Sequence, residues 1–255
     1  FGITLLQTGD VKRAADMLEH VFTVEPNNQF ALSHLTLCWR LLGDEQEAKV
    51  NNYEQLVREY YIPAPEGFST ITEFNEYLDE FLTRIHTSKN HPYQQTLRGG
   101  TQTQGNLFAW QSKELELLIT SLTASINQHL EHMASVEPPF PGFPHSRHFD
   151  FSASWSVKLR SQGFHTMHVH PMGWFSSAYY VDLPDSMDQG NREGWLKFGE
   201  PNFEPPEPLE PQYFVQPEPG KLALFPSYMW HGTVPFESDQ IRTSVAFDIV
   251  PVIKH

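Results

Sequence analysis

The chain has 255 residues, of which 39% are hydrophobic and 19% charged, so it can bury one large core or two modest ones. Its formal net charge of −14 argues against a nucleic-acid backbone or an anionic membrane surface as its partner. The single cysteine, Cys38, excludes an internal disulfide and favours a buried thiol in a reducing, cytoplasmic compartment. The sequence has no run of eighteen apolar residues, so it predicts neither a membrane helix nor a signal peptide. Because the chain opens on Phe1, we expect an upstream segment.

The first part of the chain has a helical pattern with an internal spacing of 34 residues. The recurring residues are Gly9, Asp10 and Ala14, then Gly43, Asp44 and Ala48. This spacing resembles the tetratricopeptide repeat, a helix–turn–helix unit that buries its apolar face against neighbouring repeats. A generic helical hairpin is the alternative. The pattern drifts after Ala48, although residues 51–61 still predict a helix.

Two further helices are predicted before the pattern changes. Residues 69–88 begin with Ser-Thr and carry one apolar stripe, and residues 111–133 form a second long helix. The polar, glycine-rich segment 91–108 between them predicts an extended, ordered loop. Four prolines within residues 138–144 then end the helical part of the chain.

After this point the apolar residues alternate with a period of two. Short strands are predicted at 152–160, 176–183, 194–200, 220–226 and 242–250. Five strands in about a hundred residues predict an antiparallel sandwich or barrel. The segment 200–219 holds seven prolines and five glutamates, so it predicts a lid or a solvated loop and not a core strand.

The candidate site starts from a His-x-His pair at His168 and His170. Residues i and i+2 of a strand project to the same face, so both imidazoles can approach one metal ion. His231 follows a later apolar strand and is the natural third ligand. His165 falls out of phase with the pair and is expected to be a bystander or a supporting residue.

A second same-face pair, Arg242 and Ser244, predicts a binding site for a carboxylate. A guanidinium fork pairs with a carboxylate through two hydrogen bonds, and a nearby hydroxyl adds a donor. A buried arginine without an anionic partner would be costly, and a bound dicarboxylate removes that cost.

The stretches "HVHPMGWFSSAYYV", "GKLALFPSYMWHGTVPF" and "RTSVAFDI" together resemble the 2-oxoglutarate- and Fe(II)-dependent oxygenases, in particular a bacterial branch with a His-x-His-Pro motif. The resemblance covers residues from about 91 to 251. Together with the 34-residue spacing, it predicts an α+β protein with a tetratricopeptide-like helical region at 1–88. A double-stranded β-helix (jelly-roll or cupin-like) would follow at 89–255, with residues 111–133 as its supporting helix.

The resemblance also implies a site. Fe(II) would be bound by His168, His170 and His231, with dioxygen and 2-oxoglutarate as cosubstrates. Arg242 and Ser244 would hold the distal carboxylate of 2-oxoglutarate.

The sequence departs from the superfamily where a metal-binding carboxylate is usual, because His170 occupies that position. Three neutral imidazoles are reasonable ligands for Fe(II), but they leave the full charge of +2 on the ion. Asp182 or Asp150 could supply the carboxylate instead, although both rank below His170. Zinc is the main alternative metal.

Five further residues are candidates for the surroundings of the site. Tyr179, chosen over Tyr180 by its phase with Ser177, could donate to 2-oxoglutarate. Trp174 and Trp230 could line the site and exclude water, or belong to the core. Arg98 and Gln102 could contact substrate at the mouth, although each taken alone favours a surface loop.

The sequence therefore predicts a 2-oxoglutarate-dependent Fe(II) dioxygenase that hydroxylates a C–H bond. The repeat-like helices favour a peptide or protein substrate, and the acidic surface favours a basic or neutral one. The alternatives are a small-molecule hydroxylase of the same class and a non-catalytic, cupin-like metal-binding or interaction module.

Overall fold

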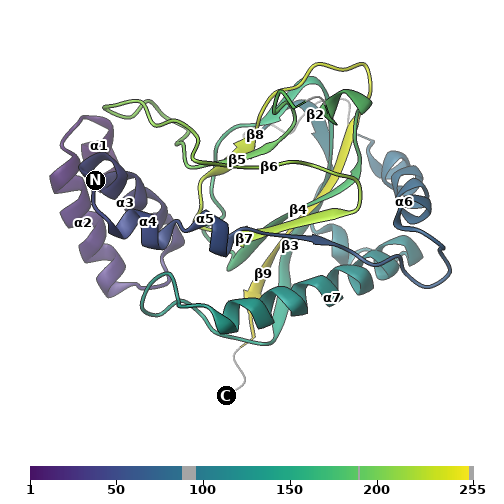
Figure 1. The fold of residues 1–255 in the computed structure, drawn as a ribbon, viewed down its shortest axis with the longest axis horizontal. Coiled ribbons are helices and arrows are strands. Elements are labelled where there is room, and N and C mark those ends of the chain that lie inside the picture. Colours follow the sequence, from purple (N-terminus) through teal and green to yellow (C-terminus); the bar gives the residue numbers. More distant parts are fainter. Residues whose placement is uncertain (88–95, 189, 253–255) are drawn as a thin grey trace.

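A computed structural model describes residues 1–87, 96–188 and 190–252 of the chain. In Figure 1 the N-terminal helices lie to the left of the strands, and two longer helices lie below the strands and to their right. The N-terminal helices are α1 (Gly2–Gln7), α2 (Val11–Val24), α3 (Gln29–Leu42), α4 (Gln46–Val50) and α5 (Tyr53–Leu56).

The helices α2 and α3 form a hairpin with well-defined ends. The side chain of Asn28 accepts a hydrogen bond from the Ala31 amide at the start of α3. Gly43 ends α3 in the left-handed conformation at φ 68°, which glycine adopts without steric cost. The predicted hairpin is present, but α4 ends after five residues at Val50, so no second long helix pair follows. The resemblance to tetratricopeptide repeats stays a prediction.

The helix predicted across residues 51–61 is wrong in its second half. The chain forms the one-turn helix α5 and then strand β1 (Arg58–Tyr61), which pairs antiparallel with β7 (Lys221–Pro226). Tyr60 faces inward, where its hydroxyl bonds Nδ1 of His129 at 3.1 Å. Tertiary pairing with an open sheet edge thus decides the conformation of this segment.

The two predicted longer helices are confirmed as α6 (Ile71–Ile85) and α7 (Lys113–Ser135). The hydroxyls of Thr70 and Ser112 cap them by accepting hydrogen bonds from amides of the first turn. Between the helices lie strand β2 (Leu97–Gln102) and the short helix η1 (Leu107–Ala109), where an extended loop was predicted. Positions 91–95 of that loop and the proposed domain boundary at 88/89 lie outside the described residues.

The remaining strands and one short helix complete the two antiparallel sheets. They are β3 (Phe149–His165), β4 (Phe175–Asp182), η2 (Asp185–Asp188), β5 (Leu196–Phe198), β6 (Tyr213–Val215), β8 (His231–Thr233) and β9 (Arg242–Pro251). The large sheet has the order β1-β7-β4-β9-β3-β2, and the small one has the order β6-β5-β8. The predicted antiparallel β-structure is confirmed, although β6 shows that part of the segment 200–219 is a strand.

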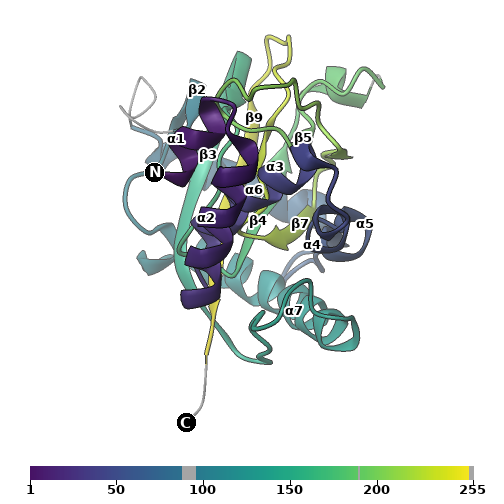
Figure 2. The same cartoon turned by 90° about the vertical axis from the view of Figure 1, so that its left-hand side faces the viewer.

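The N-terminal helices and the sheets share one hydrophobic core. The Trp230 indole donates to the Ser33 carbonyl of α3 at 2.8 Å. Arg40 of α3 donates to the carbonyls of Gly199 and Glu210, which flank the first half of the proline-rich segment. Seen from the side, α1 and α2 lie in front of the strands, with α7 below them (Figure 2). Across the described ranges, no helix combines the length and apolar character needed to cross a bilayer.

Candidate metal centre

The first two histidines lie in the short connection between β3 and β4. His168 forms an isolated antiparallel bridge with His231, in which each amide donates to the other residue's carbonyl at 2.9 and 3.0 Å. The prediction that His168 and His170 share one strand is therefore wrong, because His168 makes only this isolated bridge and His170 lies in no strand. The bridge brings the remote His231 next to the pair through backbone bonds alone.

The three imidazoles are oriented by hydrogen bonds at Nδ1. The acceptor is the Thr166 carbonyl for His168 (2.7 Å) and the Met229 carbonyl for His231 (2.9 Å). A carbonyl can only accept, so Nδ1 carries the proton in these two rings and Nε2 has a free lone pair. For His170 the partner of Nδ1 is a carboxylate oxygen of Asp248 at 2.6 Å.

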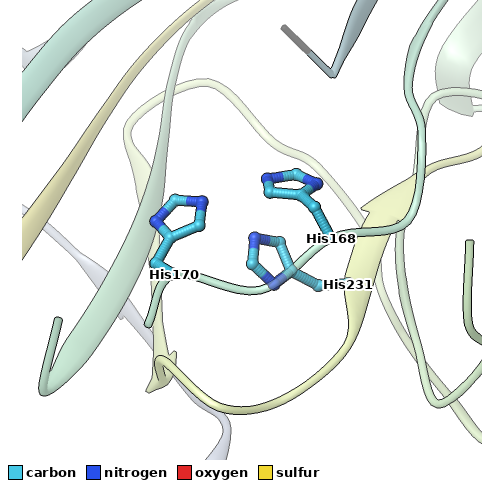
Figure 3. A group of neighbouring side chains, drawn as sticks. All are labelled: His168, His170 and His231. Carbon is cyan, nitrogen blue, oxygen red and sulfur yellow. The ribbon is translucent and has the colours of Figure 1, made fainter. Parts of the chain in front are cut away.

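The free nitrogens converge on one point. One ligand atom from each of the three histidines lies within 4.8 Å of the others, and the rings turn toward a common centre in Figure 3. In the described part of the chain, this is the one group of three or more such side chains that converges in this way. Three imidazole nitrogens on one side of an ion fit Fe(II) and leave the opposite side open.

The surroundings keep the rings of His168 and His231 in the neutral form that binds metal. Burial lowers the pKa of His168 well below its usual value, and the neighbouring His231 adds to this effect. Burial and the nearby His170 likewise lower the pKa of His231. Protons therefore compete weakly with a metal ion for these nitrogens.

Arg242 lies in the same cavity as the three histidines and is only 3% exposed. Its guanidinium donates to the Ser244 hydroxyl at 3.4 Å, and its central carbon lies 5.1 Å from the ring centre of Tyr180. Within the described residues, Arg242 forms no ion pair with a carboxylate, and its Nε and the Tyr180 hydroxyl are buried without hydrogen-bond partners. These orphaned donors fit a carboxylate ligand.

The sequence prediction selected the wrong tyrosine of the adjacent pair. The Tyr179 hydroxyl donates to Asn75 of α6 at 2.5 Å, on the outer side of the sheet. Tyr180 is the tyrosine beside Arg242. Successive residues of a strand face opposite sides of the sheet, and the sequence does not show which of these sides faces the cavity.

Neither predicted tryptophan lines the cavity. Trp174 packs against Phe143 and Phe175, and Trp230 packs toward α3. Both therefore belong to the core, which is the alternative that the sequence had left open. Trp155 of β3 lines the cavity instead, with its ring centre 5.5 Å from that of His170.

The other candidates are not among the residues that line the cavity. Arg98 is exposed on β2, and Gln102 lies at the end of the same strand, opposite Val157. Asp150 and Asp182 are exposed and do not belong to the converging group. The carboxylate nearest to the site is Asp248, which the sequence analysis missed.

His165 lies closer to the site than expected. It lines the cavity, and its ring centre is 5.8 Å from that of His168. Its Nδ1 shares a hydrogen bond with Thr96, so it stands beside the converging group and not within it. Burial, together with the charge of Arg242, lowers the pKa of His165 to about 3.

Comparison with known proteins gives the class of this site. Residues 153–248 match the family model described as "Putative 2OG-Fe(II) oxygenase". This range contains the three histidines, Arg242 and Ser244. No curated protein matches the chain.

Solved structures resemble this chain at low sequence identity, and one of them, with a TM-score of 0.51, shares its fold. The non-heme α-ketoglutarate-dependent epimerase SnoN from nogalamycin biosynthesis is 11% identical, with a TM-score of 0.51, and the match covers 82% of this chain and 84% of that one. A Pseudomonas putida prolyl-4-hydroxylase is 15% identical with a TM-score of 0.48, covering 82% and 100%. A prolyl hydroxylase from Trichoplax adhaerens, in complex with a hypoxia-inducible-factor peptide, is also 15% identical with a TM-score of 0.48, covering 82% and 92%.

The family match over residues 153–248 supports an oxygenase enzyme of the 2-oxoglutarate- and Fe(II)-dependent kind. The cofactor of this class is Fe(II), and its cosubstrates are 2-oxoglutarate and dioxygen. The predicted enzyme class and cofactors are confirmed.

Proposed function

We propose that the chain is a dioxygenase that hydroxylates a C–H bond, with His168, His170 and His231 as its iron ligands. The two sheets would form the double-stranded β-helix that surrounds the metal. The observation that carries the proposal is a single cavity in which three lone-pair nitrogens converge beside a buried guanidinium without a carboxylate partner. No other ligand class explains both features as economically as a metal ion with a bound dicarboxylate.

Each residue of the site has a role in this proposal. Fe(II) with 2-oxoglutarate and dioxygen supplies the oxidation, in which 2-oxoglutarate becomes succinate and carbon dioxide and one oxygen atom enters the substrate. Arg242 pairs with the distal carboxylate, while Ser244 and the Tyr180 hydroxyl add donors. Trp155 and Phe225 line the cavity with apolar surface that limits the access of water.

The iron and 2-oxoglutarate sites are tested together by anaerobic addition of Fe(II) and 2-oxoglutarate. We expect a weak visible charge-transfer band in the wild type that is absent in His231→Ala. The exposed His148 provides the control His148→Ala, which should keep the band. A folded wild-type protein without any band would contradict the proposal.

The 2-oxoglutarate site is tested separately at Arg242. Arg242→Lys keeps the charge but loses the planar fork, so 2-oxoglutarate affinity should fall about 10-fold or more, because hydrogen bonds to charged groups contribute about 1.5–3 kcal/mol. Iron binding should be unchanged. Arg160→Ala, at an exposed position of β3, is the control and should bind 2-oxoglutarate normally. Equal 2-oxoglutarate affinity in Arg242→Lys and the wild type would remove Arg242 from the site.

For the substrate we propose a basic or neutral peptide segment of a protein. A second cavity adjoins the first, because His165 and Thr233 line both. It combines the apolar side chains of Phe164 and Phe203 with the carboxylate of Glu204. Such a surface suits an extended chain carrying apolar and basic side chains.

A panel of peptides of equal length with basic, neutral or acidic flanks tests this substrate class. Basic and neutral peptides should stimulate succinate formation and gain oxygen by mass spectrometry, whereas acidic ones should not. Stimulation by small molecules alone would favour the small-molecule hydroxylase instead.

A further inference from the structure

The three histidines differ in what orients them. His168 and His231 donate to backbone carbonyls, whereas His170 alone is oriented by a side chain, the carboxylate of Asp248. A histidine ligand whose second nitrogen donates to a carboxylate is held in one tautomer and becomes a stronger electron donor. The contact between His170 and Asp248 has this form, with Nε2 of His170 left for the ion.

Asp248 is itself held rigidly. Its carboxylate accepts a hydrogen bond from the Ser176 hydroxyl at 2.7 Å, and Ser176 in turn contacts the Ser227 hydroxyl at 2.9 Å. The Ser227 carbonyl accepts the hydrogen bond of the His170 amide at 3.0 Å. The backbone and the ring of His170 are thus fixed by the same network of polar groups.

The charge of Asp248 has no basic counterpart within the described residues. Asp248 is 8% exposed, and in the part of the chain that the structure describes its carboxylate contacts the His170 ring and no lysine or arginine. A burial of this kind is costly for an ionised carboxylate unless a cation is near. A divalent ion bound to the opposite nitrogen of the same imidazole would provide that cation.

We propose that Asp248 is a positioning residue that directs Nε2 of His170 toward the metal. It also supplies, from behind the imidazole, the negative charge that a three-histidine ligand set lacks. In this arrangement the imidazole ring of His170 would lie between the carboxylate and the ion. This inference rests on the proposed function, because it assumes that His170 binds the metal.

The orientation is tested in the metal-free protein by nitrogen NMR of the histidine rings at about pH 8, where imidazoles are neutral. In the wild type, His168, His170 and His231 should all carry the proton on Nδ1. In Asp248→Ala, only His170 should lose this preference. Asp248→Asn should keep it, since the amide oxygen can still accept. An unchanged tautomer of His170 in Asp248→Ala would overturn the orienting role.

The charge is tested by titration with Co(II) as a spectroscopic probe, without 2-oxoglutarate. Asp248→Ala should weaken Co(II) binding by about 10- to 100-fold and alter the visible spectrum. Asp248→Asn should keep the spectrum with an intermediate affinity. Asp150→Asn, an exposed carboxylate of β3, is the control and should match the wild type.

The outcomes separate this inference from the proposed function. Wild-type affinity and spectrum in both Asp248 variants would overturn the role of Asp248 while leaving the three-histidine site intact. A wild-type protein that binds neither Co(II) nor Fe(II) would overturn both. Circular dichroism reports the folding of each variant independently. If both variants fold and Asp248→Asn keeps the Co(II) spectrum while Asp248→Ala does not, the effect does not come from a purely structural role.

Discussion

Tyr179 and Tyr180 are adjacent residues with opposite surroundings, and the roles of their hydroxyls can be separated by the same substitution. Tyr180→Phe removes a buried hydroxyl beside Arg242 and keeps the ring that faces the guanidinium. We expect 2-oxoglutarate affinity to fall about 10-fold, because a hydrogen bond to a charged carboxylate is lost. The measurement is calorimetric titration of the metal-loaded protein with 2-oxoglutarate.

The matched substitution Tyr179→Phe should affect stability and not binding. It leaves Asn75 without the donor that reaches its side-chain oxygen, which costs about 1–3 kcal/mol of the free energy of unfolding. Urea denaturation measures this loss. A fall in 2-oxoglutarate affinity in Tyr179→Phe, equal to that in Tyr180→Phe, would contradict the assignment of Tyr180 to the site.

The site residues divide according to the range of the interactions that place them. The pair Arg242 and Ser244 follows from local geometry, because alternate residues of strand β9 face one way, whereas His168 and His170 are close in sequence but lie outside a strand. The side chain of Asp248 could not be placed from the sequence. It reaches His170 because β4 pairs with β9, with Ser176 opposite Asp248, and that register is a long-range property.

Strand β8 brings its histidine to the site by a close backbone approach at Gly232. A Cβ at this position would lie 2.7 Å from the Met167 sulfur and 2.9 Å from the His165 carbonyl oxygen. Gly232→Ala should therefore push β8 away from the segment that carries His168. We expect a loss of about 1–3 kcal/mol in the free energy of unfolding from overpacking, together with weaker metal binding.

The control for this variant is Gly2→Ala, at the start of α1. A Cβ there meets the flexible side chain of Leu18 at 3.1 Å, and neither glycine requires a positive φ. Gly2→Ala should bind metal as the wild type does. Normal metal affinity in Gly232→Ala would show that the bridge between His168 and His231 tolerates displacement.

Element predictions succeeded where one periodic pattern extends over many residues and failed for several short segments. The helices α6 and α7 carry capping residues and long apolar stripes, so their existence follows from the sequence alone. Strands β1, β2 and β6 are three to six residues long, and β1 forms because β7 offers it an open edge. Local propensity could not reveal such partners.

At the scale of the whole molecule, the N-terminal helices support the site from outside. Trp230, directly before His231, donates to the Ser33 carbonyl of α3, and Tyr228 donates to the Val50 carbonyl at 2.6 Å. These two bonds fix both sides of Met229, whose carbonyl orients the His231 ring. The sequence predicted both halves of the chain but not this contact, because helix periodicity carries no information about what a helix packs against.

The shared core also predicts how the whole molecule responds to acid. His129 of α7 lies between α7 and the large sheet, fully buried against Phe175 and Tyr60. Burial lowers its pKa to about 3, and the nearby His132 adds to this effect, whereas in the unfolded chain the value is about 6.5. Between these values the unfolded state binds a proton that the folded state does not.

The free energy of unfolding should therefore be greatest above about pH 6.5 and fall as the pH decreases, with this proton contributing a slope of about 1.4 kcal/mol per pH unit. The test is urea denaturation of the metal-free protein between about pH 7 and about pH 4, compared with His129→Gln. Other buried histidines with lowered pKa, among them His86 at about 4 and His165 at about 3, contribute slopes that are common to both proteins. In His129→Gln the slope of the free energy of unfolding against pH should be smaller by the contribution of one proton, even if the free energy of unfolding at neutral pH is lower. Equal slopes in the two proteins would mean that His129 is protonated in the folded state, which its complete burial beside the aromatic rings of the sheet makes costly.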